Sequence, residues 1–173
     1  MADTGQVITK NNKTMKQKIL RTKVNIYHLT ELEPEMQVLV NKAKEQVGHA
    51  YAPYSNFRVG AAVLLTNGAL FVGNNQENAA YPSGLCAERV ALFYANAQFP
   101  DVPVRAIAIA AFTGKDFVTM PITPCGSCRQ VILESENRFD SNIAIYMYGT
   151  ECIYQLDSAK DLLPLRFEKK SLE

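Results

Sequence analysis

Hydrophobic positions along the chain recur with two different spacings, which predict its helices and strands. From residue 36 to residue 47, apolar side chains recur at the three- and four-residue steps of a helix, so one face of this segment should pack on a core. Thr30-Glu31-Leu32-Glu33 has the spacing of a capping box, and Pro34 suits a first helical turn. A helix is therefore expected to begin at this point.

Apolar runs bounded by turn residues predict five strands, over residues 57–65, 70–74, 104–112, 143–148 and 151–156. Asn67-Gly68 is a strong two-residue hairpin signal between the first two strands, which should therefore be antiparallel neighbours. Only the two residues Gly149-Thr150 join the last two predicted strands. A link that short permits only an antiparallel pair, because a parallel crossover needs about a dozen residues or more.

Two further helices are expected, over residues 86–97 and 125–137, and Ser158 can cap a last short helix that ends near Leu163-Pro164. The order is then helix, two strands, helix, strand, helix, two strands, helix. This order predicts an α/β fold: a three-layer α/β/α sandwich with a mixed five-stranded sheet and helices on both faces. Ligands should bind at loops and helix ends on one edge of that sheet.

Composition bounds the size and class of the protein. A chain of 173 residues suits one domain, and 47% hydrophobic and 20% charged residues with a net charge of +1 are ordinary for a globular protein. Such a balanced charge does not indicate a nucleic-acid partner. The longest apolar run, residues 106–112, is far shorter than a membrane span, and no apolar signal-peptide core follows the first methionine, so a cytoplasmic location is expected.

The first 29 residues differ in composition from the rest. They are rich in Lys, Asn and Thr and lack sustained periodicity, so residues 1–29 are predicted to form a flexible basic arm and residues 30–173 the catalytic domain. The arm could contact nucleic acid or act as a targeting segment. A solvated tail is the favoured interpretation, because no aromatic residues are interleaved with the charges and the Ser- and Arg-rich bias of a transit peptide is missing.

Two short stretches carry the chemistry: Cys86-Ala87-Glu88 and Pro124-Cys125-Gly126-Ser127-Cys128, both at predicted helix starts. Three thiolates can hold a tetrahedral zinc ion and leave its fourth position open for water, as a hydrolytic site requires. Cys125 and Cys128 share a helix face at a spacing of three residues. Residues two apart diverge on a regular helix, so Cys86 must lie at the helix edge if it and Glu88 are to reach the same ion.

Glu88 distinguishes a catalytic zinc site from its alternatives. A carboxylate beside the metal can accept a proton from its water and pass it to a leaving group, for which a redox pair or a structural zinc site has no use. A His or Cys followed two residues later by Glu, and then by P-C-x-x-C, is the known signature of zinc deaminases. His28 and His49 lie outside both motifs, and Cys152 is interpreted as a packed thiol.

The charge of the site also calls for compensation. Three thiolates and Zn²⁺ sum to one negative charge, which two helix N-termini offset by about 0.3–1 kcal/mol each. Arg89 is expected to donate hydrogen bonds to ligand sulfurs.

Taken together, the motifs of the chain resemble those of the small homotetrameric zinc-dependent cytidine deaminase family. The matching stretches are Tyr51-Ala-Pro-Tyr54-Ser55, Phe57-Arg-Val-Gly60-Ala-Ala, Asn75-Gln-Glu77-Asn78, Cys86-Ala-Glu-Arg89, Pro124-Cys-Gly-Ser-Cys-Arg-Gln130 and Leu162-Leu-Pro-Leu-Arg-Phe167. The resemblance implies a cytidine deaminase-like fold with one Zn²⁺ per subunit. It implies hydrolysis of cytidine or 2′-deoxycytidine to the uridine product and ammonia.

The resemblance also implies substrate contacts. Asn75 and Glu77 would hydrogen-bond the ribose, with Glu77 at the 3′-hydroxyl, and the N-x-E alternation puts both on one face of an extended segment. Phe57 would form one wall for the base, and the main chain at Ala87 would bind the pyrimidine edge.

Two more aromatic residues are implicated in assembly by the same resemblance. Phe167 corresponds to the aromatic that reaches the base in a neighbouring subunit's site, and Tyr81 should lie near that interface. The competing interpretation of Phe167 is an anchor for the tail in its own core. The predicted partners are thus a nucleoside and other copies of the chain, with neither nucleic acid nor membrane.

Three alternative functions remain open. A polynucleotide base editor would need a basic groove and stacking aromatics, and by family analogy a parallel arrangement of the last strands. A zinc-stabilised interaction module would not need Glu88. A deaminase for another aminopyrimidine nucleoside, such as the blasticidin class, shares the zinc motif.

Overall fold

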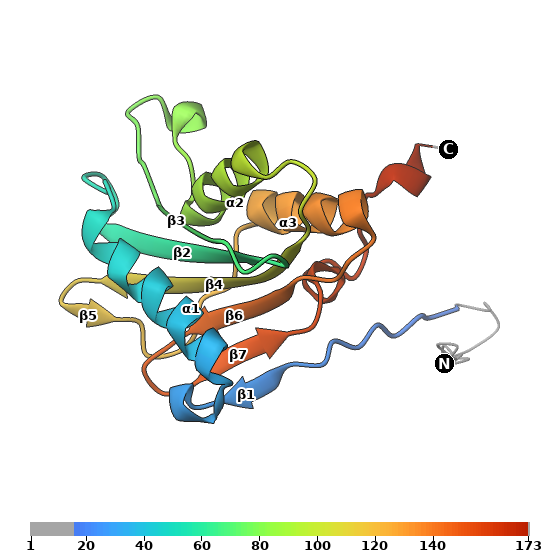
Figure 1. Ribbon diagram of the computed structural model, residues 1–173, viewed down its shortest axis with the longest axis horizontal. Coiled ribbons are helices and arrows are strands. Elements are labelled where there is room, and N and C mark those ends of the chain that lie inside the picture. Colours follow the sequence, from blue (N-terminus) through green and yellow to red (C-terminus); the bar gives the residue numbers. More distant parts are fainter. Residues whose placement is uncertain (1–15, 173) are drawn as a thin grey trace.

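A mixed seven-stranded sheet forms the centre of the protein in the computed structural model, which describes residues 16–172 (Figure 1). The strand order is β1-β7-β6-β4-β2-β3, and β5 pairs with the end of β4. The strands are β1 (Asn25–Tyr27), β2 (Phe57–Leu65), β3 (Leu70–Asn74), β4 (Val104–Thr113), β5 (Asp116–Phe117), β6 (Ala144–Tyr148) and β7 (Ile153–Leu156). The helices are α1 (Pro34–Gln46), α2 (Ala87–Gln98) and α3 (Gly126–Phe139), with short 3-10 segments between elements.

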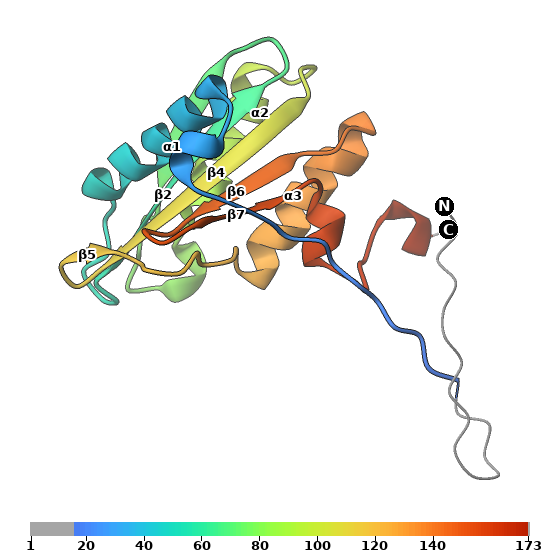
Figure 2. The same cartoon turned by 90° about the horizontal axis from the view of Figure 1, so that it is seen from below.

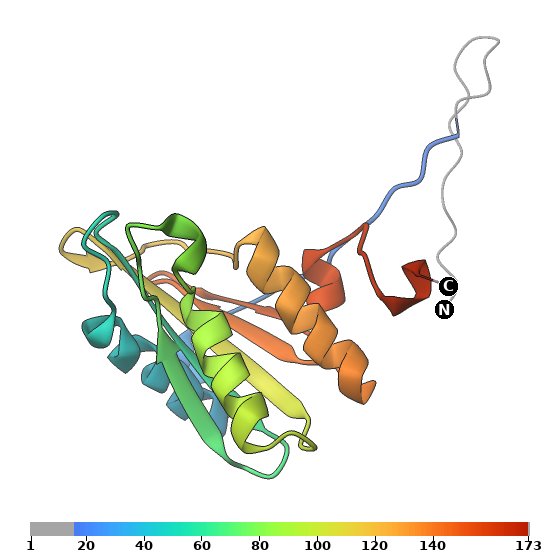
Figure 3. The same cartoon turned by 90° about the horizontal axis from the view of Figure 1, so that it is seen from above.

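The three helices divide the structure into layers. Helix α1 crosses one face of the sheet, and α2 and α3 lie side by side on the other (Figures 2 and 3). The apolar stripe predicted for α1 packs on one face with Ala62, Leu64 and Ala108, while α2 and α3 pack with Val63, Ile107 and Ile109 on the opposite face. Both faces of β2 and β4 are therefore buried, which explains their continuous apolar sequences.

The predicted α/β/α architecture is confirmed, and so is the antiparallel pairing of the last two long strands, β6 and β7. All five predicted strands are present, but the sheet is not five-stranded. It gains β5, a pair of residues inside the polar loop after β4, and β1, which pairs antiparallel with β7. Neither strand is longer than three residues, which is too short for a periodic sequence signal.

The β2–β3 hairpin differs from its prediction in loop length. Gly68 N donates to Leu65 O (3.0 Å), and Leu65 N donates to Ala69 O (2.9 Å), so the loop has three residues, 66–68. Gly68 takes the left-handed conformation (φ 85°) that this loop requires of its last residue.

Two N-terminal expectations need correction. The capping box is formed by His28 and Glu31 at a 3-10 turn, whereas α1 is preceded by Glu33, which makes no side-chain cap. Within the predicted arm, residues 25–27 form β1 and thus belong to the sheet. Residues 1–15, with Lys10 and Lys13 of the basic arm, lie outside the described part of the chain.

A buried carboxyl group fastens α3 to the chain that follows it. Glu136, 1% exposed, accepts hydrogen bonds from Ile143 N, Ala159 N and Ser158 Oγ, each at 2.8 Å. Ser158 in turn caps the predicted last helix, a 3-10 turn over Ala159–Leu162. Glu136 therefore ties α3 to the start of β6 and to the segment after β7.

Replacing Glu136 by Ala is expected to lower the free energy of unfolding by about 3 kcal/mol or more, because three buried donors lose their acceptor. Equilibrium denaturation would measure this loss. Glu134→Ala is the matched control, since Glu134 is an exposed residue of the same helix. A loss no larger than that of the control would contradict the role assigned to Glu136.

Candidate active site

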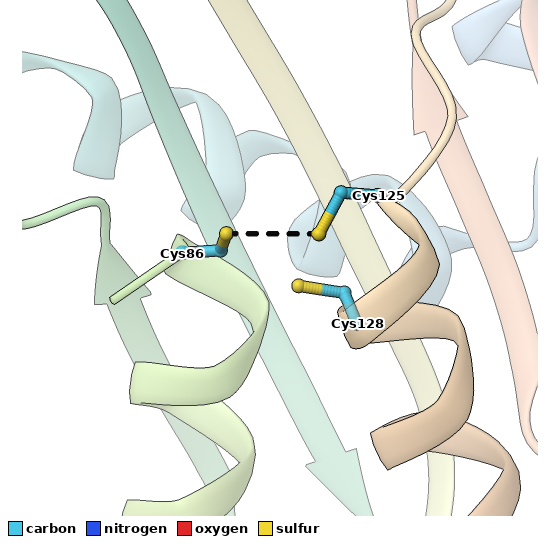
Figure 4. A group of neighbouring side chains, drawn as sticks. All are labelled: Cys86, Cys125 and Cys128. Atoms are coloured by element: carbon cyan, nitrogen blue, oxygen red, sulfur yellow. Dashed lines mark hydrogen bonds between the residues drawn. The ribbon is translucent and has the colours of Figure 1, made fainter. Parts of the chain in front are cut away.

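The N-termini of α2 and α3 meet at one point above the sheet, and each presents a cysteine there (Figure 4). Cys86 is the N-cap of α2 (φ −72°, ψ 152°) and Cys125 that of α3 (φ −64°, ψ 163°). Both are extended rather than helical, so neither follows the helical repeat. Cys86 lies at the helix edge as its spacing from Glu88 required, and Cys128 follows one turn into α3.

The three sulfur atoms have the separation that a tetrahedral zinc ion needs. All three lie within 4.8 Å of one another, and Cys86 Sγ is 3.8 Å from Cys125 Sγ (Figure 4). Zn–S bonds of about 2.3 Å at tetrahedral angles put two sulfurs about 3.8 Å apart. The donor set therefore fits zinc. Among the described residues, this is the one group of three or more His, Cys, Asp or Glu side chains with such geometry.

Close backbone packing positions both cysteine-bearing segments. A Cβ on Gly73 of β3 would lie 2.5 Å from Ala91 N and 2.8 Å from Ala87 O, so only glycine lets α2 approach the sheet this closely. A Cβ on Gly149, after β6, would lie 2.6 Å from Thr119 O and 2.7 Å from Pro121 N. Gly149 thus allows the loop that leads to Cys125 to pack against the sheet edge.

Hydrogen bonds among the cysteines set their acidities. The Cys128 thiol donates to Cys86 and Arg89 also donates to it, which together lower the pKa of Cys86 from 9.0 to about 5. As the donor in this pair, and by burial, Cys128 has a raised pKa. One thiolate is thus favoured even without metal, and a divalent cation would stabilise the others, because thiolate ligands bind metals after losing their protons.

Glu88 lies in the first turn of α2 and is 4% exposed. Burial raises the pKa of its carboxyl group, and the negative charge of Cys86 raises it further. A carboxyl group with a raised pKa beside a metal site is suited to carry protons near neutral pH.

Arg89 lies on the next position of the helix and contacts the first cysteine. Its Nη2 is 3.9 Å from Cys86 Sγ and 3.4 Å from Gly84 O. The guanidinium therefore brings positive charge and a donor to the sulfur cluster.

A cavity of about 580 Å³ opens beside the cysteines, a volume typical of small-molecule sites. Cys86, Glu88 and Cys125 lie among its lining residues, as do Asn75 and Glu77. Apolar side chains of Phe57, Val59, Leu85 and Ile122 also line it. The lining of the cavity thus combines sulfur, carboxylate and amide groups with apolar side chains.

The carboxylate of Glu77 is held by the turn before β2. It accepts from Tyr54 N (2.9 Å), from Ser55 N (3.3 Å) and from the Ser55 hydroxyl. The Ser55 hydroxyl and the Tyr54 amide lower the pKa of Glu77, so its side chain is an anion over the physiological range.

Asn75 braces the start of β2 from the neighbouring segment. Its Oδ1 accepts from Val59 N (2.7 Å), and its Nδ2 donates to Phe57 O (3.0 Å). The side chain lines the cavity while it fixes the backbone that carries Phe57.

Sequence reasoning missed the turn that supports these residues. The sequence marks Ser55 only as part of a matching stretch, and Asn56 carries no prediction, yet Asn56 adopts a left-handed conformation (φ 55°) between Ser55 and Phe57. Asn tolerates this region better than most residues, which is the one signal that could have indicated a tight reversal here.

The remaining predicted residues lie in different surroundings. Ala87 is fully buried as the first residue of α2, whereas Tyr81 is 78% exposed at the cavity rim, with its ring 6.3 Å from that of Tyr54. Phe167 is 59% exposed, so its side chain is not buried in its own core.

Comparison with known proteins agrees with this geometry. Residues 34–140 match the family model described as the cytidine and deoxycytidylate deaminase zinc-binding region. The chain belongs to the cytidine deaminase family.

Relatives of known sequence and structure extend the likeness over most of the chain. A cytidine deaminase of Halalkalibacterium halodurans is 36% identical over 80% of this chain and 98% of its own length. The crystal structure of a cytidine deaminase from Burkholderia pseudomallei superimposes with a TM-score of 0.64 at 41% identity, covering 75% of this chain and 97% of that one. For a cytidine deaminase from Mycobacterium tuberculosis the TM-score is 0.60 at 32% identity, covering 79% and 99%.

Family membership and sulfur geometry together confirm the predicted cofactor. Zinc is bound in this cytidine deaminase family member by Cys86, Cys125 and Cys128. In residues 16–172, no helix combines the length and hydropathy required to traverse a lipid bilayer.

Substitution of Arg89 by Ala is expected to lower activity or zinc affinity by about 10- to 100-fold, because it removes a donor and a positive charge from the ligand sulfurs. Thermal denaturation should shift little by comparison. Arg105→Ala is the control, since Arg105 pairs with Glu35 at 2.6 Å on the surface and neither residue lines the cavity. Wild-type turnover and zinc affinity in the Arg89 variant would contradict the role assigned to Arg89.

Proposed function

We propose that this protein hydrolyses cytidine and 2′-deoxycytidine to uridine and 2′-deoxyuridine, releasing ammonia, as a cytoplasmic enzyme of pyrimidine salvage. One observation carries the proposal: a buried carboxyl group, Glu88, adjoins three convergent sulfurs at a cavity of about 580 Å³. Deamination needs this combination because a proton must travel from water to the leaving amino group.

The cavity supports a nucleoside as the substrate. Its lining offers polar and apolar groups, as a nucleoside does, and the amino group of the base would lie toward Glu88 and the ribose toward Glu77. Phe57 and Ile122 lie among the lining residues and would cover the faces of the ring. Ala87 N belongs to the first turn of α2, whose N–H groups have no acceptor within the helix, and it is the proposed donor to the pyrimidine edge.

Glu88 is the proposed proton carrier. When zinc is bound, it lowers the pKa of a coordinated water and so provides a nucleophile at neutral pH. Glu88 takes one proton from the water and delivers it to ring N3, which makes C4 electrophilic. As the oxygen bonds to C4, the second water proton passes through Glu88 to the amino group. The C4–N bond then breaks, ammonia leaves, and the carbonyl of uridine remains.

Glu77 gives the proposed preference for free nucleosides. Its anionic carboxylate, already held by Tyr54 and Ser55, accepts a hydrogen bond from the 3′-hydroxyl. A phosphate at that position would meet a like charge at short range, which disfavours chains extended there. Asn75 would contact the ribose with the remaining hydrogen-bonding capacity of its amide.

The active enzyme is proposed to be a homotetramer in which a neighbouring subunit supplies Phe167. The support is exposure: Leu165 is 87% and Phe167 59% exposed, although Gln130 Nε2 fixes the backbone by donating to Phe167 O (2.9 Å). Tyr81, at the rim of the cavity, would lie at the contact between subunits.

Ammonia release from cytidine, 2′-deoxycytidine, CMP and a short oligonucleotide, measured with zinc content, tests the substrate. Both nucleosides should react with at least tenfold higher kcat/KM than CMP or the oligonucleotide. Preference for the oligonucleotide would overturn the proposal.

The Glu88→Gln variant is expected to retain one zinc per subunit and to lose at least about 100-fold in kcat, because the amide cannot carry the proton. Metal analysis and ammonia release measure the two quantities. Glu134→Gln, an exposed carboxylate of α3, is the matched control. Robust turnover by the Glu88 variant would rule out its assignment.

The Phe167→Ala variant, or truncation before Phe167, should raise KM without unfolding the domain. The expected increase is about 5- to 150-fold, which corresponds to the loss of stacking between one base and one aromatic ring. Leu172→Ala is the control, since Leu172 is 75% exposed on the same tail. Mixed assembly of Phe167→Ala with inactive Glu88→Gln subunits should restore low-KM activity. Failure of this complementation, with co-assembly verified, would mean that Phe167 does not act across subunits.

A further inference from the structure

The Arg129 side chain donates three hydrogen bonds to two separate segments of the chain and has no part in the chemistry described above. This half-buried residue follows Cys128 in α3. Its Nε donates to Pro124 O (2.8 Å), its Nη2 to Thr123 Oγ1 (2.7 Å) and its Nη1 to Leu162 O (3.1 Å). A guanidinium is suited to such bridging, because its donors diverge in a rigid plane and it stays charged.

Two of these bonds fix the approach to a zinc ligand. The Pro124 carbonyl belongs to the peptide immediately before Cys125, and Thr123 lines the cavity. The Arg129 main chain also binds Cys125, because Arg129 N donates to Cys125 O (3.0 Å). Cys125 itself is exposed, so few surrounding side chains restrict its sulfur. Its direction therefore depends on the peptide that Arg129 holds.

The third bond extends to the C-terminal segment. Leu162 ends the 3-10 turn that Glu136 and Ser158 secure, and Gln130, the next residue along α3, binds the backbone at Phe167. The first two turns of α3 thus hold the loop before Cys125 on one side and the C-terminal segment on the other.

We propose that Arg129 is a positioning residue that sets the place of Cys125 as a zinc ligand and of Thr123 as cavity wall. It acts through three hydrogen bonds and touches neither metal nor substrate. A single positive charge would not suffice, because three acceptors in different directions must be satisfied together. The expected effect on KM for cytidine rests on the proposed function. The expected effects on zinc affinity and on the Co²⁺ spectrum depend only on the zinc site.

The experiment compares Arg129→Lys and Arg129→Gln with the native chain. Zinc affinity is measured by chelator competition, ligand geometry by the visible spectrum of the Co²⁺-substituted protein, and substrate binding by KM for cytidine. Arg138→Gln is the matched control, since Arg138 lies on the same helix and donates to Pro100 O, which does not line the cavity. Circular dichroism of the metal-free proteins reports folding.

Both Arg129 variants should bind zinc about 10- to 100-fold more weakly, alter the Co²⁺ spectrum and raise KM, with Arg138→Gln unchanged. Arg129→Lys should not restore zinc affinity or KM, because one ammonium group cannot replace the diverging donors of the guanidinium. Native zinc affinity and Co²⁺ spectrum in Arg129→Gln would overturn the proposal, as would full rescue by Lys. If KM alone stays native while zinc affinity falls, the Cys125 role stands and the Thr123 role is refuted.

A variant of the acceptor covers the case in which the Arg129 variants do not fold. Thr123→Val removes one bond of the three and leaves α3 intact. It should change the Co²⁺ spectrum in the same direction and raise KM by a smaller factor. A native spectrum together with a native KM in this variant would refute the proposal.

Discussion

The structure depends on bringing two helix N-termini to one point above a sheet. Helices α2 and α3 both begin there, and each begins with a cysteine in extended conformation. A helix start has unpaired N–H groups and a partial positive charge, which favours thiolates and, with three of them together, a cation among them. Each helix is also held by another part of the chain: α2 sits against Gly73 of β3, and Glu136 fastens α3 to Ile143, just before β6, and to the turn after β7.

This arrangement also shifts the pKa values of the two carboxyl groups of the cavity in opposite directions. Glu88 is buried beside the sulfurs, so the pKa of its side chain is raised, while hydrogen bonds from Ser55 and Tyr54 lower the pKa of Glu77. The same functional group is therefore suited to carry protons in Glu88 and to act as a fixed acceptor in Glu77. The fold places the two side chains in different surroundings, and those surroundings determine what each carboxyl group can do.

The parts of the fold that sequence could predict are those fixed by local pattern. The bounds of β2 and β3 were predicted correctly, because an apolar run and Asn67-Gly68 mark them, and the three cysteines were found by spacing alone. What sequence missed depends on tertiary contact. Strand β1 exists because β7 offers it an edge, and the capping box forms at His28, two residues before Thr30, where the chain makes a 3-10 turn. Nothing local in Arg129 or Ser55 indicates which distant carbonyl or carboxylate each one binds.

The most direct test of this account is X-ray absorption spectroscopy at the zinc edge on the metal-loaded protein. Three protein sulfurs and one exchangeable position predict three sulfur scatterers at about 2.3 Å and one oxygen scatterer at about 2.0–2.2 Å. Replacement of Cys86, Cys125 or Cys128 by Ser should remove one sulfur each. Four sulfurs, or a fourth protein ligand that closes the coordination sphere, would contradict a hydrolytic site.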